Sequence, residues 1–593
     1  MRIFRNKKLR KILEGRNRRG REIDPHDVLS DFSNLTESDL DRMEGRLILP
    51  IERSSYIFLF SIFIIAGLFA VVRLGNLQLV QGFDYAKRSA TNSLQKTIVF
   101  ANRGIIFDRN GDLLASNEPP VEVNGKLEVW SERKYATSTG LSTLLGYISY
   151  PKVDSKGNFY DTNIFGKDGA EEYFDDVLAG KNGTLIEETD ARGKIVSQSA
   201  IDNPRDGTNV TLSIDKNVQN RMYEELKNLA NERGYAGGAG VIMDINSGEI
   251  LALASYPEFD SQIMANGKDR AAIASFLLNK HNPFLDRAVQ GLYIPGSIVK
   301  PYLAIGALEE KIVDPEKQFL ANGQITVPNP YDKAHPTIFK DWKVHGLVDM
   351  RKAIAVSSNV YFFTIGAGYE GQRGLGIANI QKYMNMFGFG SKTGVEVDAE
   401  ESGNIPSPIW KAKTFPNDPT WRLGDTYNSS IGQYGYLVTP IQAVRAVSAI
   451  ANGGYLVSPT IVKRGVQNAP LEDKLNEKGE SLKEVKKETL PVAQENLQIV
   501  REGMRKGVLE GTAVGLNIPQ VVVAAKTGTA ELGVTKESVN SWTTGFFPYD
   551  KPRFAFAIAM EKGSRSNTVG STYAMRRVLE WMSIYTPQYL RSE

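Results

Sequence analysis

A serine and a lysine three residues apart, Ser297 and Lys300, are the residues of this sequence best spaced for nucleophilic chemistry. Pro295-Gly296 gives the sharp entry expected before a helix, which the pattern predicts over 298–308. Residues i and i+3 share one helix face, so the hydroxyl and the amine would lie together. A serine hydroxyl needs a base to take its proton, and an uncharged lysine can be that base. The positive end of the helix dipole disfavours the ammonium form.

The spacing alone identifies no site, because Ser93–Lys96 and Ser131–Lys134 also have it. A surface serine beside a solvated lysine explains most such matches. A second motif, Ser357-x-Asn359, interrupts an apolar helical pattern over 348–363. Polar side chains are costly there unless they are hydrogen-bonded, and capping of a second helix is the plainer explanation.

A third motif, Lys526-Thr527-Gly528, lies in a β-branched run that predicts a strand over 520–530. A strand of small residues at a pocket edge allows a substrate backbone to pair with it, and a glycine allows close approach. An ordinary strand with a turn explains the tripeptide alone. Joint occurrence of the three motifs favours one pocket built from distant segments.

The stretch 54–72 contains no charged residue. At about 1.5 Å per residue it reaches roughly 28 Å, which is enough for a bilayer core. Ten lysines and arginines crowd residues 1–21, so the positive-inside rule keeps this end in the cytoplasm and sends the remainder across. A cleaved signal peptide is disfavoured because the leader is long and no A-x-A site follows.

Composition excludes several other functions. The chain has no cysteine, which excludes disulfides, thiolate metal sites and cysteine nucleophiles. Its four histidines form no H-E-x-x-H pair, and no G-x-S-x-G elbow is present. A net charge of +3 does not indicate nucleic-acid binding.

The 593 residues predict two or three folded units. Turn signals such as Asn110-Gly111 predict a β-rich region, which ends in a helix over 216–233 capped by Asp215. Arg103, Asp108 and Arg109 are expected to join domains. Four segments are predicted: a cytoplasmic basic arm at 1–53, a transmembrane helix at 54–78, a β-rich region at 79–235 and a C-terminal domain at 236–593.

The three motifs, in this order, resemble the active-site set of penicillin-recognising serine enzymes. Longer matches, among them Arg103–Gly111, Asp286–Ala288 and Trp421–Gln433, resemble the penicillin-binding protein 2 family of class B peptidoglycan transpeptidases. The resemblance implies an α+β fold: an antiparallel sheet flanked by helices forms a penicillin-binding/β-lactamase-like transpeptidase domain. That domain would stand on a β-rich, dimerisation-like pedestal at 79–235, with one N-terminal transmembrane helix.

The family implies D,D-transpeptidation that cross-links peptidoglycan stem peptides during cell elongation, acylation by β-lactams, and no cofactor. It implies a location in the inner (cytoplasmic) membrane, with the N-terminus in the cytoplasm and the catalytic domain outside. The implied partner is a multi-pass membrane glycosyltransferase of the shape-elongation-division-sporulation family, contacted through the membrane helix and pedestal.

The resemblance also implies the role of each motif residue. Ser297 would attack the penultimate D-Ala carbonyl, with Lys300 as base, and Ser357 would relay the proton to the leaving amine. Asn359 would hold Lys300 and a substrate amide. Which lysine or serine moves which proton stays open. The implied catalytic residues are Ser297, Lys300, Ser357, Asn359 and Lys526.

The third motif would bind substrate, through Thr527, Gly528 and Thr529. Lys526 and Thr527 would hold the terminal carboxylate by charge-assisted bonds. The backbone N–H groups of Ser297 and Thr529 would form the oxyanion hole.

Two departures from the family pattern stand out. Tyr434 occupies a position where glycine usually follows Ile-Gly-Gln, which could reshape the pocket rim. Some relatives bind zinc through Asp, His and Cys; Asp341 and His345 occur here without a cysteine, so no metal is expected.

Rival functions remain open. A division-septum transpeptidase shares all three motifs, although the Gly-Asp-Thr and Ile-Gly-Gln runs favour elongation. A β-lactam-sensing membrane receptor fits the single membrane helix but does not need the large pedestal. A β-lactamase would need a placed deacylating water. A bifunctional class A enzyme is disfavoured because no glycosyltransferase signature is seen, and intact motifs disfavour a pseudoenzyme.

Overall fold

The computed structural model describes residues 53–591 except 121, 124–125, 128, 156–158, 190–194, 330–331, 333, 398 and 465–484. The chain divides into two compact units between Ser93 and Leu94. The predicted basic arm, 1–53, lies outside the described residues apart from Arg53. The predicted boundaries at 78 and 235 stay predictions.

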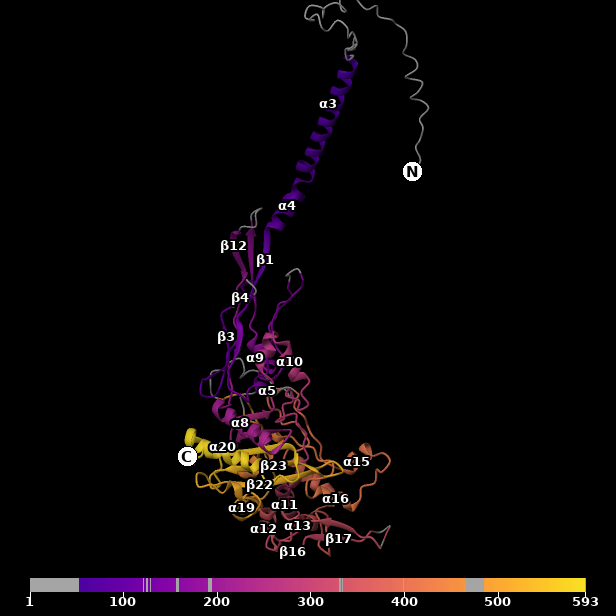
Figure 1. The fold of residues 1–593 in the computed structure, drawn as a ribbon, viewed down its shortest axis with the longest axis vertical. Coiled ribbons are helices and arrows are strands. Elements are labelled where there is room, and N and C mark those ends of the chain that lie inside the picture. The colour runs from indigo at the N-terminus through magenta and orange to yellow at the C-terminus, as the bar shows by residue number, and fades with distance from the viewer. Residues whose placement is uncertain are drawn as a thin grey trace, which may run out of the picture. The chain divides into compact units, whose positions relative to one another are not determined.

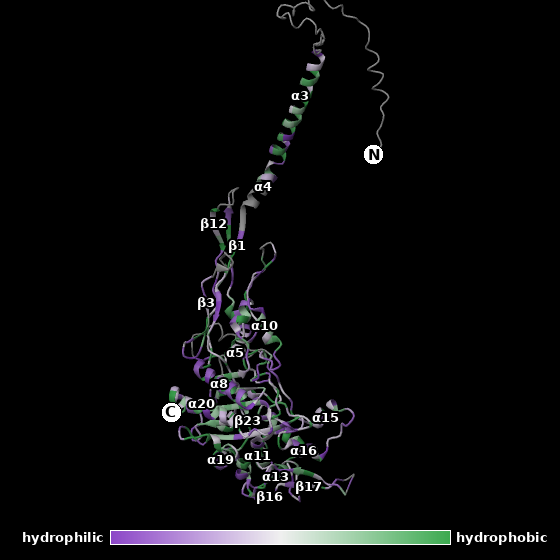
Figure 2. Cartoon of the chain, viewed as in Figure 1, coloured by the Kyte–Doolittle hydropathy of each residue, from purple (hydrophilic) through white to green (hydrophobic). Residues whose placement is uncertain are grey.

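The described residues of the first unit, from Arg53 on, are almost all helical. They form α3 (Arg53–Gly75), the short π-helix η2 (Asn76–Val80) and α4 (Gly82–Ser93). Figure 2 colours α3 as largely apolar. Arg53–Val80, with a mean hydropathy of 2.6 in its most apolar window, is the one described helix long and apolar enough to cross a membrane. The fold thus has the predicted N-terminal membrane-helix candidate.

The second unit begins with small sheets. β1 (Leu94–Val99), β11 (Gly183–Thr189) and β12 (Ile195–Asp202) form an antiparallel sheet. A four-stranded sheet has the order β13 (Val210–Thr211), β2 (Ile106–Phe107), β3 (Leu113–Glu118), β6 (Glu132–Tyr135). The antiparallel pair β2–β3 confirms the predicted hairpin at Asn110-Gly111. The other elements here are β4 (Glu122–Val123), β5 (Lys126–Leu127), α5 (Ser142–Leu145), β7 (Ile148–Ser149), β8 (Lys152–Val153), β9 (Phe159–Asp161), β10 (Phe165–Gly166), α6 (Gly169–Tyr173) and α7 (Asp175–Leu178).

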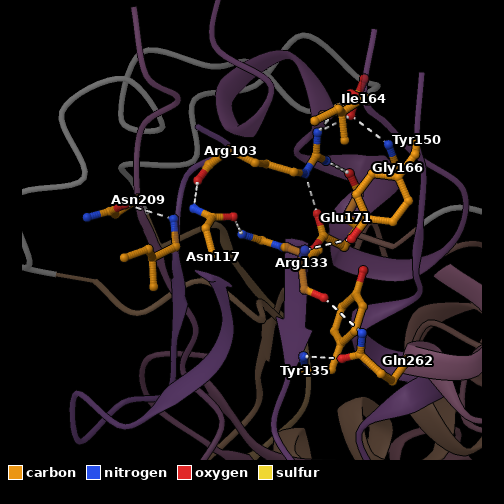
Figure 3. Close-up of polar contacts among 12 residues, drawn as sticks. Arg103, Asn117, Arg133, Tyr135, Tyr150, Ile164, Gly166, Glu171, Asn209 and Gln262 are labelled. Carbon is orange, nitrogen blue, oxygen red and sulfur yellow. Dashed lines mark hydrogen bonds and ion pairs between the residues drawn. The ribbon is translucent and has the colours of Figure 1, made fainter. Parts of the chain in front are cut away.

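A buried ionic cluster holds this β-rich region together (Figure 3). Glu171, which is fully buried, accepts from Arg103 Nε at 2.5 Å and from Arg133 Nε at 2.7 Å. Arg103 also pairs with Asp175 at 2.7 Å, and Arg133 bonds Asn117 Oδ1 at 3.0 Å. Burial would raise the pKa of Glu171, but Arg133 and Arg103 outweigh it and lower that pKa. The carboxylate therefore stays ionised between two buried guanidinium groups.

Of the three residues expected to join domains, Arg109 pairs with a residue of the C-terminal region. Its Nη2 lies 3.4 Å from Glu249 Oε2, beyond residue 235. Arg103 instead serves the buried cluster, and Asp108 accepts from the Lys216 N–H at 3.1 Å. Lys216 begins the helix Lys216–Arg233, which packs on the C-terminal sheet, so the expectation stays a prediction for Asp108. The ion pairs of Arg103 lie within 79–235.

A five-stranded antiparallel sheet forms the centre of the C-terminal region. Its order is β15 (Ile250–Tyr256), β14 (Gly237–Asp244), β24 (Phe554–Ser564), β23 (Ser538–Phe547), β22 (Ala524–Leu532). Successive residues of a strand face opposite sides. Accordingly, Val241 packs in one buried core and its neighbour Ile242 in the other.

Helices cover both faces of this sheet (Figure 1). One core includes residues of α8 (Lys216–Arg233) and α20 (Ser571–Tyr585). The other includes α11 (Lys300–Glu309) and α17 (Pro440–Ala451). As predicted, Asp215 caps α8, accepting from the Asn217 and Val218 N–H groups.

Further helices and strands complete the described part of the C-terminal region. They are α9 (Ser261–Asn266), α10 (Arg270–Leu277), η3 (Gly296–Val299), β16 (Phe319–Ala321), β17 (Gln324–Val327), β18 (Thr337–Lys340), β19 (Gly346–Val348), α12 (Met350–Val356), α13 (Asn359–Ala367), α14 (Gly376–Met386), α15 (Pro408–Thr414), α16 (Leu423–Ser429), β20 (Tyr455–Val457), β21 (Lys487–Thr489), α19 (Gln494–Glu510), η4 (Val514–Leu516) and η5 (Pro587–Tyr589).

The buried cluster gives a direct stability test. Glu171→Gln leaves two buried arginines without their shared counter-charge, so we expect a loss of about 3–5 kcal/mol in the free energy of unfolding. Glu118→Gln is the matched control: its ion pair with Lys134 is exposed and 3.7 Å long, so the loss should stay below about 1 kcal/mol. Denaturant unfolding of the purified chain measures both. Equal effects of the two substitutions would show that Glu171 does not hold the region together.

Candidate active site

A break between two helices sets the geometry of the second motif. α12 ends at Val356, and Ser357 follows with a left-handed φ of 59°. Ser358 then caps α13 through its hydroxyl, which accepts from the Tyr361 N–H. Helix capping, the plainer explanation of this motif, therefore accounts for Ser358, which lies between Ser357 and Asn359. The left-handed turn places the carbonyl and hydroxyl of Ser357 near Lys300.

The Lys300 amine is surrounded by the second motif. Lys300 begins α11 and is fully buried. Its Nζ donates to the Ser357 carbonyl at 2.8 Å and to Asn359 Oδ1 at 2.7 Å. The Ser357 hydroxyl lies 3.3 Å away. These acceptors fix the amine without pairing it with a carboxylate.

Lys526 approaches the same serine from β22. Its side chain is buried, and Nζ donates to Ser357 Oγ at 2.8 Å and to the Thr527 carbonyl at 2.7 Å. Ser357 Oγ therefore connects two lysines from distant parts of the chain. β22 is an edge strand of the sheet, and its neighbour within the sheet is β23. The outer edge of β22 therefore pairs with no other strand of this sheet.

Ser297 lies on the 3₁₀ turn η3, one turn ahead of Lys300, and is half-buried. The predicted helix over 298–308 thus begins with a 3₁₀ turn. Trp542, on β23, donates from Nε1 to the Ile294 carbonyl at 3.0 Å. This bond attaches the segment that precedes η3 to the sheet. A Cβ on Gly528 would lie 2.6 Å from the Pro295 carbonyl oxygen, so glycine allows β22 to meet this turn.

Hydrogen bonds therefore link four of the five predicted catalytic residues: Lys300, Ser357, Asn359 and Lys526. Among the contacts of the described residues, none joins the Ser297 hydroxyl to this network. Catalytic hydrogen bonds often form only in the substrate complex. Of the predicted substrate-binding residues, Thr527 is half-buried, Gly528 is buried and Thr529 is exposed along β22.

Burial makes both lysines unusually acidic. Desolvation lowers the pKa of Lys300 to about 7, although the Asp341 carboxylate opposes this shift. Desolvation also lowers the pKa of Lys526 well below its usual value, and the charge of Lys300 lowers it further. An amine with a pKa near neutrality can take a proton from a hydroxyl, which an ordinary ammonium group cannot.

Asp341, which entered the sequence analysis only as half of a metal pair, supports the second motif. Its Oδ2 accepts from Ser358 Oγ at 2.8 Å and from the Val360 N–H at 2.9 Å. His345 Nε2 lies 3.5 Å from Asp341 Oδ1. Within the described residues no three His, Cys, Asp or Glu side chains group to hold a metal. Sequence reasoning missed this capping role because 19 residues separate Asp341 from Val360.

Tyr434 shapes the region beside the nucleophile. It has a left-handed φ of 62°, a backbone conformation that glycine adopts more readily than tyrosine. Its ring lies 5.8 Å from both Trp410 and Trp421. Lys411 stands over the ring, with Nζ 5.7 Å from its centroid, and pairs with Asp425 at 2.6 Å. An aromatic and ionic cluster thus stabilises this conformation.

Comparison with family models gives two matches. Residues 238–580, more than half of the chain, match the penicillin binding protein transpeptidase domain. Residues 124–212 match the penicillin-binding protein dimerisation domain. The chain belongs to the class B penicillin-binding proteins of the penicillin-binding protein 2 type. The resemblance and the fold class inferred from the sequence are confirmed.

Curated relatives agree with this family. The chain is similar to peptidoglycan D,D-transpeptidase MrdA of Acinetobacter baumannii, at 32% identity over 74% of this chain and 64% of that protein. The match therefore spans just under two thirds of that relative's length. Peptidoglycan D,D-transpeptidase MrdA of Salmonella typhimurium is 27% identical over 87% of this chain and 93% of its own length.

Solved structures show the same fold. A complex between penicillin-binding protein 2 and MreC from Helicobacter pylori matches with a TM-score of 0.64 and 26% identity, covering 83% of this chain and 99% of that one. Penicillin-binding protein 2 of Pseudomonas aeruginosa in complex with WCK 5153 matches with a TM-score of 0.65 and 26% identity, covering 84% and 99%. A peptidoglycan synthase complex matches with a TM-score of 0.68 and 25% identity, covering 90% and 98%.

The acidity of Lys300 predicts a pH profile. Acylation by a β-lactam should become faster as pH rises and level off above about 7, because only the neutral amine accepts the Ser297 proton. The second-order acylation rate measured from about pH 5.5 to about pH 9 gives the profile. Asp341→Asn keeps a capping oxygen but removes the charge that raises the pKa of Lys300. That variant should shift the rising limb to lower pH. A rate that is still rising steeply at about pH 9 would contradict a neutral Lys300.

Proposed function

We propose that the chain is a serine-type D,D-transpeptidase that cross-links peptidoglycan stem peptides through an acyl-enzyme on Ser297. The observation that carries this proposal is the pair of buried lysines bonded to Ser357 beside the turn that bears Ser297. The family and the activity named for its relatives agree with it. The reaction needs no cofactor.

The first half-reaction forms the acyl-enzyme. Ser297 Oγ attacks the carbonyl carbon of the penultimate D-Ala while neutral Lys300 takes the hydroxyl proton. The peptide C–N bond then breaks, and the leaving D-Ala amine gains its proton through Ser357. Ser357 suits this relay because its hydroxyl accepts from both lysine amines.

The second half-reaction releases the cross-link. An amine of a neighbouring stem peptide attacks the acyl carbon, its proton is taken along the same relay, and Ser297 leaves as a hydroxyl. Asn359 would hold Lys300 and a substrate amide during both steps, as its 2.7 Å bond to Lys300 allows. A β-lactam would follow the first half-reaction only.

The third motif orients the substrate. Lys526 and Thr527 would bind the terminal carboxylate by charge-assisted hydrogen bonds. Thr529 is exposed and β22 is the last strand of its sheet, so the substrate backbone would pair with the outer edge of β22 beside Gly528. The N–H groups of Ser297 and Thr529 would stabilise the tetrahedral oxyanion, typically by about 10²–10³-fold in rate.

We further propose a role in cell elongation, with α3 as a single membrane anchor, the N-terminus in the cytoplasm and the catalytic domain outside the inner membrane. The named relatives and the structural neighbours of penicillin-binding protein 2 type favour this over a division enzyme. The similar peptidoglycan synthase complex supports a multi-pass glycosyltransferase of the shape-elongation-division-sporulation family as partner.

Labelling with a fluorescent penicillin tests the acyl-enzyme. Wild type should form a lasting adduct, and Ser297→Ala should form none because the attacking oxygen is gone. Ser131→Ala is a matched control from another S-x-x-K sequence and should label like wild type. Peptide mass spectrometry locates the adduct. An adduct on another residue would contradict the mechanism. An adduct lost within seconds would indicate a β-lactamase.

Depletion in the source cell separates the two cellular roles. Loss of an elongation enzyme should give rounded cells, because side-wall synthesis stops while septa still form. Phase-contrast microscopy over several generations records the shape. Filaments would assign the chain to division, and unchanged shape with lost β-lactam signalling would favour the receptor.

A further inference from the structure

A threonine outside the three motifs contacts the third one. Thr512 follows the C-terminal end of α19, and its Oγ1 lies 2.5 Å from Thr527 Oγ1. Either oxygen can be the donor in this bond. Both side chains are half-buried, so each keeps part of its surface exposed. Nothing in the spacing of the motifs points to Thr512.

The segment around Thr512 is fixed between the second and third motifs. The Thr512 N–H donates to the Ala355 carbonyl at 3.1 Å, two residues before Ser357. A Cβ on Gly511 would lie 2.1 Å from that carbonyl oxygen, so only glycine fits there. On the other side, a Cβ on Gly507 would lie 3.1 Å from the Ala525 carbonyl oxygen, one residue before Lys526. The backbone of Thr512 is thus held close to both motifs.

In a pair of hydroxyls this close, one oxygen donates its hydrogen to the other. Which of the two donates decides whether Thr527 can also donate to an anion. If Thr527 donates to Thr512, Thr527 presents only lone pairs to an approaching carboxylate. If Thr512 donates, the Thr527 hydrogen is free to point to that carboxylate. A hydrogen bond to a charged group is stronger than one between neutral groups, so a bound carboxylate selects the second arrangement.

We infer that Thr512 is a positioning residue that orients the Thr527 hydroxyl as a donor to the terminal carboxylate of the substrate. The inference rests on the proposed function, in which Thr527 binds that carboxylate. Thr512 itself touches neither the reacting atoms nor the substrate. Its effect therefore belongs to substrate capture and not to the chemical step.

Thr512→Val tests this because valine keeps the shape and removes the hydroxyl. We expect the half-saturating concentration of an acyl-D-alanyl thioester with a free carboxylate to rise about 5- to 10-fold, the usual effect of one lost hydrogen bond. The maximal acylation rate should change less than about 2-fold. The methyl ester of the same thioester should show no such loss. Thr512→Ser, which restores the hydroxyl, should behave like wild type.

A double-mutant cycle on the full chain completes the test. In a Thr527→Val background, Thr512→Val should have no further effect, because the hydroxyl it orients is absent. Thr572→Val is the matched control: it breaks a similar bond to Thr543 Oγ1, 2.8 Å long, between β23 and α20, and should leave acylation unchanged. Thermal unfolding checks that each variant is folded, and Thr512→Ala replaces the valine variant if that one is not.

The outcomes separate this inference from the proposed function. Failure of wild type to be acylated overturns both. Acylated wild type with equal losses for the acid and its ester, a loss confined to the maximal rate, or an additive loss in the Thr527→Val background overturns the role of Thr512 alone.

Discussion

Two lysine amines are buried around one serine hydroxyl, and the rest of the site depends on the cost of that arrangement. An ammonium group removed from water is strongly disfavoured unless it is paired. Here Lys300 meets a carbonyl, a hydroxyl and an amide oxygen, and Lys526 meets a hydroxyl and a carbonyl. These acceptors hold an amine without restoring its ordinary basicity. The outcome is a base whose pKa of about 7 gives it a substantial neutral fraction near physiological pH.

Such a cluster lasts only if the surrounding structure fixes it. Ser357 has a left-handed backbone that a serine adopts at some energetic cost. α12 and α13 hold that turn from both sides, with Asp341 capping α13, and α19 packs against both α12 and β22. The sheet and its two helical layers thus serve to bring a helix break, a 3₁₀ turn and an edge strand to one point.

The sequence predicted the local parts of this arrangement well. Ser297, Lys300 and Lys526 stood out because their motifs occur in order, and Asp215 was identified as a cap because it directly precedes a helical pattern. Asp341 and Thr512 could not be found this way, since their contacts with Val360 and Thr527 depend on tertiary packing. The strand expected from residue 520 begins at Ala524, because β-branched residues favour extended backbone whether or not they pair in a sheet.

The protonation state of Lys300 in the free protein is the most direct measure of this account. Lysine labelled with ¹³C at Cε reports the charge on each amine during an NMR titration, and Lys300→Arg identifies the signal of interest. The account predicts that this signal titrates with a pKa of about 7. A signal that titrates near the ordinary lysine value would mean that Lys300 is a cation at neutral pH, and its role as the base would be contradicted.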